Sequence, residues 1–303
     1  MIAPPPTPNR PEKAPAAVPI AASLHVTRGI LGRVPQPTAD ALAEVLRPLT
    51  EDPSHAAILL DVDGTLSPIV ERAQDAHVPE KTSRVLGVLA RRYGLVAAIS
   101  GRAAMDTRRL VGVGGITYAG SHGAELLAPG DSKPTVLPAF ATWTGRVRAF
   151  VAARDDRELR RLRVRIEDKG PIQALHWRGA PDEDAARTRV EGIAHEAESE
   201  GFLTHWGRKV LEVRPPVPVN KGRAVEQLLL RAPSVRTAMY AGDDATDLDA
   251  WDALDRLLKE GRLDACIRVG VASDEGPPQI AERADITVPG IPGFAEALDI
   301  LAS

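Results

Sequence analysis

The sequence predicts an α/β fold in which a smaller α+β block is inserted into an open, largely parallel sheet. Short apolar runs alternate with helical segments over residues 38–119 and again over 221–288. Strands separated by helices pair in parallel through right-handed crossovers, with both sheet faces covered. Between these regions, residues 163–214 show strand-like alternation around one amphipathic helix, which is typical of an antiparallel unit. The length of 303 residues, at roughly 150 per domain, also predicts about two domains.

Composition and charge narrow the function classes. The chain has 38 Lys and Arg residues against 41 Asp and Glu residues, so it has no basic field to hold nucleic acid or an anionic membrane. Its single cysteine, Cys266, cannot form an intramolecular disulfide or a four-cysteine zinc site, which fits a reducing compartment. No stretch approaches ~18 consecutive apolar residues, and the N-terminus lacks a secretory-signal layout. We therefore expect a cytoplasmic protein without a nucleic-acid or membrane partner.

The first elements form a tail followed by three helix–strand pairs. Residues 1–37 are rich in proline and alanine, which favours a flexible, solvated tail. Apolar residues at helical spacing and short apolar runs predict helices over 38–49, 81–92 and 105–110, and strands over 56–60, 94–99 and 116–119. These elements make up the first part of the predicted core, which we place at residues 38–127.

The middle of the chain has the pattern of an antiparallel sheet with one helix, and after it the alternation of helices and strands resumes. Strands are expected over 163–167, 172–178 and 210–214, with a helix over 184–200 whose apolar stripe is Ala186, Val190, Ile193 and Ala197. We assign these elements to an inserted cap domain, residues 128–211. The second part of the core, residues 212–303, is expected to contain helices over 221–230 and 248–258 and strands over 238–241, 267–269 and 286–288.

The sharpest motif, Asp61-Val62-Asp63-Gly64-Thr65, follows directly after the predicted strand 56–60. The carboxyl ends of parallel strands form the ligand crevice of an open α/β sheet, so the motif places two carboxylates there. Two like charges in a crevice are costly unless a cation joins them, and carboxylate oxygens suit Mg²⁺. The glycine allows a tight departure of the chain, and the threonine hydroxyl can face an anion. The alternative is an Asp-Gly turn with solvated carboxylates.

Three further motifs carry matching chemistry. Ser100-Gly101-Arg102 offers a hydroxyl, a close backbone approach and a guanidinium to a phosphate, or a serine cap to the next helix. Asn220-Lys221-Gly222 opens a helix with an ammonium group that could neutralise a phosphoryl group and a carboxylate, or that is simply solvated. Gly242-Asp243-Asp244-Ala245-Thr246-Asp247 supplies three acids for an oxygen cage around Mg²⁺, or a helix N-cap.

In this order the four motifs resemble those of the haloacid dehalogenase superfamily of phosphotransferases. The resemblance implies a Rossmann-like core in which Asp61 is the nucleophile that forms an aspartyl-phosphate, and Asp63 is the general acid and then the base. It implies that Ser100 and Lys221 hold the phosphoryl group and orient Asp61, with Thr65 and Gly101 also contacting the substrate. It further implies that Mg²⁺ is bound by Asp61, Asp63, Asp243 and Asp244, and that Asp247 orients these ligands.

Further stretches resemble trehalose-6-phosphate phosphatases, whose inserted cap is of the C2 type. They are Gly120-Ser121-His122-Gly123-Ala124-Glu125, Glu167-Asp168-Lys169, His176-Trp177-Arg178 and Leu211-Glu212-Val213-Arg214-Pro215, together with the 242–247 motif. The resemblance spans roughly Ile58 to Gly293 and so covers both core and cap. The disaccharide-binding residues that it implies are Ser121, His122, Glu125, Glu167 and Lys169, and by extension Arg102, Arg178 and Glu212.

The cap residues suit a sugar by type, because charged groups hydrogen-bond strongly to hydroxyls. Glu167 and Lys169 would share one face of a strand, as would His176 and Arg178. The alternative is that these pairs form only the solvated face of an antiparallel sheet. Trp177 lies on the opposite face and is expected in the core of the cap.

We therefore expect a Mg²⁺-dependent phosphatase that converts trehalose 6-phosphate to trehalose and phosphate, with a functional link to a trehalose-phosphate synthase. The cap would exclude water and recognise the leaving group. One alternative is a related capped phosphatase for another sugar phosphate, such as sucrose phosphate or a mannosyl-glycerate phosphate. Another is a catalytically silent sugar-phosphate sensor, against which the presence of Asp61, Asp63, Lys221 and Asp243 argues.

Overall fold

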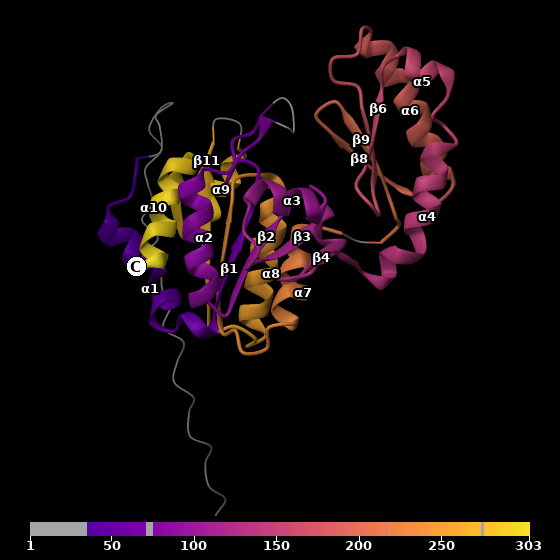
Figure 1. Cartoon of the computed structure of the whole chain (residues 1–303). Coiled ribbons are helices and arrows are strands. Elements are labelled where there is room, and N and C mark those ends of the chain that lie inside the picture. Colours follow the sequence, from indigo (N-terminus) through magenta and orange to yellow (C-terminus); the bar gives the residue numbers. More distant parts are fainter. Residues whose placement is uncertain (1–34, 71–74, 218, 274–275) are drawn as a thin grey trace, which may run out of the picture. The chain divides into compact units, whose positions relative to one another are not determined.

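The computed structural model describes residues 35–303 except 71–74, 218 and 274–275. The predicted tail therefore lies outside the described residues, apart from residues 35–37. The described residues fall in one compact unit, Arg33–Ser303, which contains an eight-stranded and a four-stranded sheet (Figure 1). Among the described helices, none is both long enough and apolar enough to span a membrane.

The eight-stranded sheet is the core of the predicted α/β fold. Its strand order is β12-β11-β10-β1-β2-β3-β4-β5, and neighbours from β12 to β3 run parallel. The parallel strands are β1 (Ala56–Leu60), β2 (Leu95–Ile99), β3 (Thr117–Gly120), β10 (Thr237–Gly242), β11 (Ala265–Ala272) and β12 (Ile286–Pro289). Two short antiparallel strands, β4 (Glu125–Leu127) and β5 (Thr135–Val136), complete one edge. The predicted open, mainly parallel sheet is confirmed.

Strand β1 lies in the middle of this sheet and is buried on both faces. Its residues Ile58 and Leu60 belong to one apolar cluster, whereas Ala57 and Leu59 belong to another on the opposite face. The first cluster includes residues of α1 (Ala39–Glu51), α2 (Glu80–Arg92), α3 (Ala104–Val111) and α10 (Gly290–Ala302). The second includes residues of α7 (Lys221–Leu230), α8 (Ala245–Lys259) and α9 (Pro278–Arg283). This two-sided burial explains why the strand is an uninterrupted apolar run.

The four-stranded sheet forms the inserted cap domain and is antiparallel throughout, in the order β6-β7-β9-β8. Its strands are β6 (Arg165–Asp168), β7 (Gln173–His176), β8 (Leu203–Gly207) and β9 (Val210–Arg214). One face packs on α4 (Pro138–Ala152), α5 (Arg157–Arg161) and α6 (Glu183–Ser199), in a cluster that contains Trp177 as expected. The other face aligns Glu167, Ala174, Glu212 and His205 in register across the four strands.

Several elements differ from the sequence-based expectation. Helices α4, α5, α9 and α10 and strands β4, β5 and β8 were not predicted. Strand β8 is exposed at four of its five residues, so it lacks the alternation that marks a half-buried strand. Strand β5 pairs in the core sheet although it lies beyond residue 127, and β9 lies wholly in the cap sheet although the expected boundary at 211 falls inside it.

Candidate active site

Asp61 lies one residue beyond β1, and the chain turns sharply after it. The backbone N–H of Asp61 donates to the carbonyl of Ala241 at 2.9 Å, which extends the pairing with β10 by one residue. Gly64 then adopts φ +95°, and its N–H donates to the carbonyl of Ser67 at 2.7 Å. A Cβ atom at Gly64 would collide with the carboxylate of Asp243. Glycine is therefore required here both by the backbone conformation and by the approach of this loop to Asp243.

Lys221 is the first residue of α7, whose N-cap, Asn220, accepts a hydrogen bond from the N–H of Arg223 at 2.9 Å. Its Nζ atom donates to Oδ1 of Asp61 and to Oδ1 of Asp247, each at 2.6 Å. Burial opposes the charge on this lysine, but the carboxylates of Asp247 and Asp61 outweigh that effect and raise the pKa of Lys221. Lys221 is thus a buried cation between two acids, and the alternative of a solvated lysine is excluded.

Asp247 is held by four donors. Its Oδ1 accepts hydrogen bonds from Lys221 and from the hydroxyl of Tyr240, and its Oδ2 accepts from the N–H groups of Asp243 and Asp244. Both oxygens are therefore occupied by protein groups. The side chain orients Lys221 and the backbone that carries Asp243. Tyr240 was missed by sequence reasoning, because a tyrosine inside a buried strand has the pattern of a core residue.

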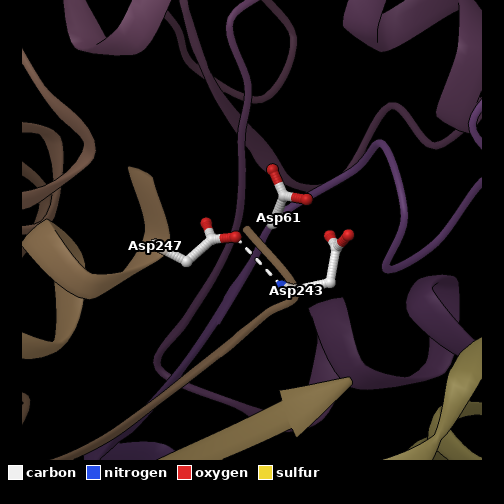
Figure 2. Close-up of side chains that lie close together, drawn as sticks. All are labelled: Asp61, Asp243 and Asp247. Carbon is white, nitrogen blue, oxygen red and sulfur yellow. Dashed lines mark hydrogen bonds between the residues drawn. The ribbon is translucent and has the colours of Figure 1, made fainter. Parts of the chain in front are cut away.

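Three buried carboxylates gather beside this lysine. One oxygen from each of Asp61, Asp243 and Asp247 lies within 4.8 Å of the others (Figure 2). Burial, with Asp247 nearby, raises the pKa of Asp243 to about 7, and burial also raises that of Asp61 in spite of Lys221. Oδ2 of Asp61 is buried and has no hydrogen-bond partner among the described residues. Buried oxygen ligands with excess negative charge fit a divalent cation, for which Asp61 and Asp243 remain available.

The other two predicted metal ligands, Asp63 and Asp244, make different contacts from Asp61 and Asp243. The carboxylate of Asp63 faces Arg102, whose Nη2 donates to Oδ1 at 2.6 Å and whose Nε donates to Oδ2 at 2.8 Å. Asp244 is exposed and caps α8, with its Oδ1 accepting from the N–H of Ala245 at 2.6 Å. Thr65 is buried, and its hydroxyl donates to Oδ1 of Asp243 at 3.3 Å. In the part of the chain that the structure describes, neither Asp63 nor Asp244 joins the carboxylate cluster.

The loops that follow β2 and β3 are joined by their backbones. The N–H of His122 donates to the carbonyl of Ser100 at 3.0 Å, and that of Ser121 to the carbonyl of Arg102 at 2.7 Å. Ser100 is buried and accepts from the N–H of Arg102 at 3.1 Å, so it holds its own loop and does not cap α3. His122 adopts φ +56° with its ring against Gly101. Burial, together with Arg214, lowers the pKa of His122 to about 3, which keeps its ring neutral.

The cap contributes a charged network to the same region. Nζ of Lys169 donates to Oε1 of Glu212 at 2.9 Å, and Nε of Arg214 donates to Oε2 of the same carboxylate at 2.9 Å. Burial opposes the charge on Glu212, but Lys169 and Arg214 outweigh it and hold the pKa at about 2. The hydroxyl of Ser121, in the core, donates to the backbone carbonyl of Lys169 at 3.0 Å. The cap network is therefore tied directly to the loop that carries His122.

The other residues predicted to bind the disaccharide are Glu167, Glu125 and Arg178, and each has its own hydrogen-bond partner in the structure. Glu167 accepts a hydrogen bond from Nε2 of His176 at 2.7 Å, which joins β6 and β7. Glu125 is buried and its Oε2 accepts from the N–H of Ala104 at 2.9 Å. Arg178 is exposed beyond β7 and donates to the carbonyl of Arg208 at 3.3 Å. Arg214 was missed as a site residue, although its spacing of two from Glu212 on one strand was a usable signal.

Comparisons with known proteins agree with these observations. The trehalose-phosphatase family model matches residues 59–279. A trehalose-phosphate phosphatase of Mycolicibacterium paratuberculosis is 36% identical over 214 residues, which cover 66% of this chain and 51% of that protein. An uncharacterized glycosyl hydrolase of Mycobacterium tuberculosis is 37% identical over 205 residues, covering 65% of this chain and 15% of that protein. The chain thus spans about half the length of the phosphatase that it matches.

A solved structure shares the fold. The C-terminal domain of the Candida albicans trehalose-6-phosphate phosphatase superposes with a TM-score of 0.65 at 23% identity, covering 88% of this chain and 97% of that domain. The match includes both the core and the cap, because 88% of the chain exceeds the extent of either alone. It supports the predicted Rossmann-like core with an inserted α+β cap.

Proposed function

Because the chain belongs to the trehalose-phosphatase family, we propose that it hydrolyses trehalose 6-phosphate to trehalose and phosphate with the help of Mg²⁺. The observation that carries the proposal is the environment of Asp61. One oxygen of this buried carboxylate is fixed by Lys221, and the other has no protein partner among the described residues. A carboxylate held in this way is suited to attack phosphorus, since its orientation is set and its second oxygen is available.

The first step transfers the phosphoryl group to the protein. An oxygen of Asp61 forms a bond to phosphorus while the bond between phosphorus and the sugar oxygen breaks. Asp63 donates a proton to the leaving sugar oxygen, which departs as the hydroxyl of trehalose. Lys221 keeps Asp61 oriented and supplies positive charge next to the site of transfer. Ser100, directly after β2, and Thr65, in the loop after β1, are both buried, and we propose that they contact the phosphoryl oxygens.

The second step releases phosphate. A water molecule attacks phosphorus, Asp63 accepts its proton, and the bond between Asp61 and phosphorus breaks. Mg²⁺ held by Asp61 and Asp243 would neutralise negative charge on the phosphoryl group. Arg102, which holds Asp63 in this structure, must loosen that contact for Asp63 to exchange protons with the sugar and with water.

The cap residues are proposed to recognise the disaccharide. Lys169, Glu212 and Glu167 offer charged hydrogen-bonding groups on one face of the cap sheet, and His122 offers a neutral ring from the core. Among the residues predicted to bind the disaccharide, Arg178 has the least structural support, because it is exposed and lies beyond the end of β7. Substrate recognition by the cap would explain why charged side chains occupy this face.

The cellular setting is likewise a proposal. The single cysteine fits a cytoplasmic protein. The substrate is a phosphorylated disaccharide, so a glycosyl-transfer reaction that makes trehalose 6-phosphate must precede this step, which is the proposed link to a synthase.

Phosphate release by the purified chain and by its Asp61→Asn variant tests the proposal. Asparagine keeps the shape of the side chain but is a much weaker nucleophile, so turnover of trehalose 6-phosphate should fall by roughly 10⁴-fold or more. Thermal unfolding serves as the control for folding. Turnover that survives in the Asp61→Asn variant contradicts the aspartyl-phosphate mechanism.

A further inference from the structure

The N-terminus of α3 has no cap of its own. The residue before it, Ala103, makes no side-chain cap, although the first N–H groups of a helix lack partners within the helix. Gly120, at the end of β3, lies so close that a Cβ atom there would collide with the backbone N of Ala104. The register partner of Gly120 is Glu125 on β4, and Oε2 of Glu125 accepts a hydrogen bond from that same N–H at 2.9 Å. Glu125, on the neighbouring strand β4, therefore takes the place of the missing helix N-cap residue of α3.

The other carboxylate oxygen of Glu125 faces the cap domain. Gly170, with φ +75°, lies at the tip of the hairpin between β6 and β7, and a Cβ atom there would collide with Oε1 of Glu125. Beside this contact, the hydroxyl of Ser121 donates to the carbonyl of Lys169 at 3.0 Å. The hairpin tip, Lys169–Gly170, is thus seated on the core at Ser121 and Glu125.

We propose that Glu125 is a positioning residue rather than a sugar ligand, because its carboxylate holds the start of α3 with one oxygen and seats the cap hairpin with the other. Glu125 as a whole residue is only 5% exposed. Burial raises its pKa, which fits an acid enclosed by protein on both sides. This role differs from the disaccharide binding that family resemblance implied for Glu125. It rests on the proposed function, in which Ser100, Arg102 and Lys169 serve a phosphorylated sugar.

Two parts of the site depend on this one carboxylate. Only Ala103 separates Ser100-Gly101-Arg102 from the start of α3, so a displaced helix end would move both the hydroxyl of Ser100 and the guanidinium that holds Asp63. A displaced hairpin tip would move Lys169, which pairs with Glu212. The first effect acts on every phosphate ester, whereas the second acts only on a substrate that reaches the cap.

Kinetics of Glu125→Ala and Glu125→Gln separate positioning from sugar binding. Alanine removes both contacts, and glutamine keeps an acceptor oxygen at the same reach. Glu125→Ala should lower kcat at least about tenfold for both trehalose 6-phosphate and p-nitrophenyl phosphate, because misplacement of reacting groups affects both. Glu125→Gln should stay within about threefold of wild type, since the hydrogen bond from Ala104 is retained.

A second substitution tests the capping role itself. Serine at an N-cap position accepts hydrogen bonds from the first turn of a helix, so Ala103→Ser should restore part of the p-nitrophenyl phosphate turnover lost in Glu125→Ala. Two kinetic outcomes overturn the proposal. One is a raised KM for trehalose 6-phosphate alone with unchanged aryl phosphate turnover in Glu125→Ala. The other is a Glu125→Gln variant as impaired as Glu125→Ala.

Amide hydrogen exchange tests whether Glu125 positions these two segments, and it does not depend on catalytic activity. In Glu125→Ala, exchange at residues 104–107 and 168–171 should accelerate by at least about fivefold, because a lost cap weakens the first helical turn. Residues at the start of α8, which has its own cap in Asp244, serve as the internal control. Unchanged exchange at both sites overturns the positioning role. A wild-type chain that hydrolyses no phosphate ester would instead contradict the proposed function, while the exchange result would still judge Glu125.

Discussion

The ammonium group of Lys221 lies 2.6 Å from Oδ1 of Asp61, and both side chains are at most 5% exposed. A second carboxylate, that of Asp247, contacts the same ammonium group at 2.6 Å. The lysine therefore compensates two buried negative charges that have little access to water. Its removal has consequences for stability as well as for catalysis.

Lys221→Met should lower the free energy of unfolding by about 3–5 kcal/mol, because it leaves buried carboxylates without their partner. Lys81→Met is a matched control, since Lys81 also lies 2.6 Å from a carboxylate, that of Asp299, but with 68% of its side chain exposed. An exposed pair contributes about 0–1 kcal/mol. Urea unfolding of both variants measures the difference. Equal losses in the two variants would contradict the account of Lys221.

The neutral ring of His122 predicts a loss of stability in acid. Its pKa is lowered from 6.5 to about 3 in the folded chain, so between these pH values the unfolded chain binds a proton that the folded chain does not. The contribution of His122 is complete above pH 6.5 and declines by up to about 1.4 kcal/mol for each pH unit below it.

The comparison variant is His122→Asn, because asparagine does not titrate and tolerates the left-handed conformation, φ +56°, of this position. Denaturant unfolding of both proteins between pH 7 and pH 4 gives the difference in unfolding free energy. The wild type should lose stability relative to the variant as the pH falls. Parallel curves would show that the ring is not held neutral.

Lys169→Ala should separate sugar recognition from phosphoryl transfer. Loss of a charged hydrogen bond to the disaccharide should raise KM for trehalose 6-phosphate by about tenfold or more. Turnover of p-nitrophenyl phosphate, which lacks the sugar, should stay within about twofold of wild type. Arg160→Ala, which removes an exposed cap ion pair with Asp155, is the control. An unchanged KM in Lys169→Ala would remove this residue from the substrate site.

Metal binding should be visible in stability. Mg²⁺ that binds the folded chain at Asp61 and Asp243 raises the midpoint of thermal unfolding by mass action. Asp243→Asn should abolish that increase, and without metal it should be at least as stable as wild type, since it removes one of several crowded buried acids. EDTA should stop turnover of the wild type. A Mg²⁺-induced shift of equal size in both proteins would place the metal elsewhere.

Much of the core could be predicted from the sequence because its elements carry local signals. Strand β1 is an uninterrupted apolar run, and α7 begins directly after the N-cap Asn220, so both were predicted with the bounds observed. The short strands β4 and β5 have two or three residues each and no period to detect. Strand β8 is exposed along most of its length and is defined by its pairing with β9.

In the site, too, residues marked by a local sequence motif could be predicted, whereas contacts between separate elements could not. The motifs located Asp61, Lys221 and Asp243, because each directly follows a strand or starts a helix. The pairing of Asp63 with Arg102 joins residues 39 positions apart, and the contact between Gly170 and Glu125 joins cap and core. Such contacts depend on how separate elements pack, which periodicity and spacing do not encode.

The most direct test of the central claim is the kcat/KM for phosphate release, with Mg²⁺, from trehalose 6-phosphate, sucrose 6-phosphate, glucose 6-phosphate and p-nitrophenyl phosphate. Trehalose 6-phosphate should be preferred by at least about a hundredfold, because a site built to hydrogen-bond a sugar discriminates against analogues that leave its groups unpaired. Preference for another sugar phosphate would contradict the substrate but keep the chemistry of Asp61. No release from any of the four would contradict the phosphatase itself and favour a sugar-phosphate sensor.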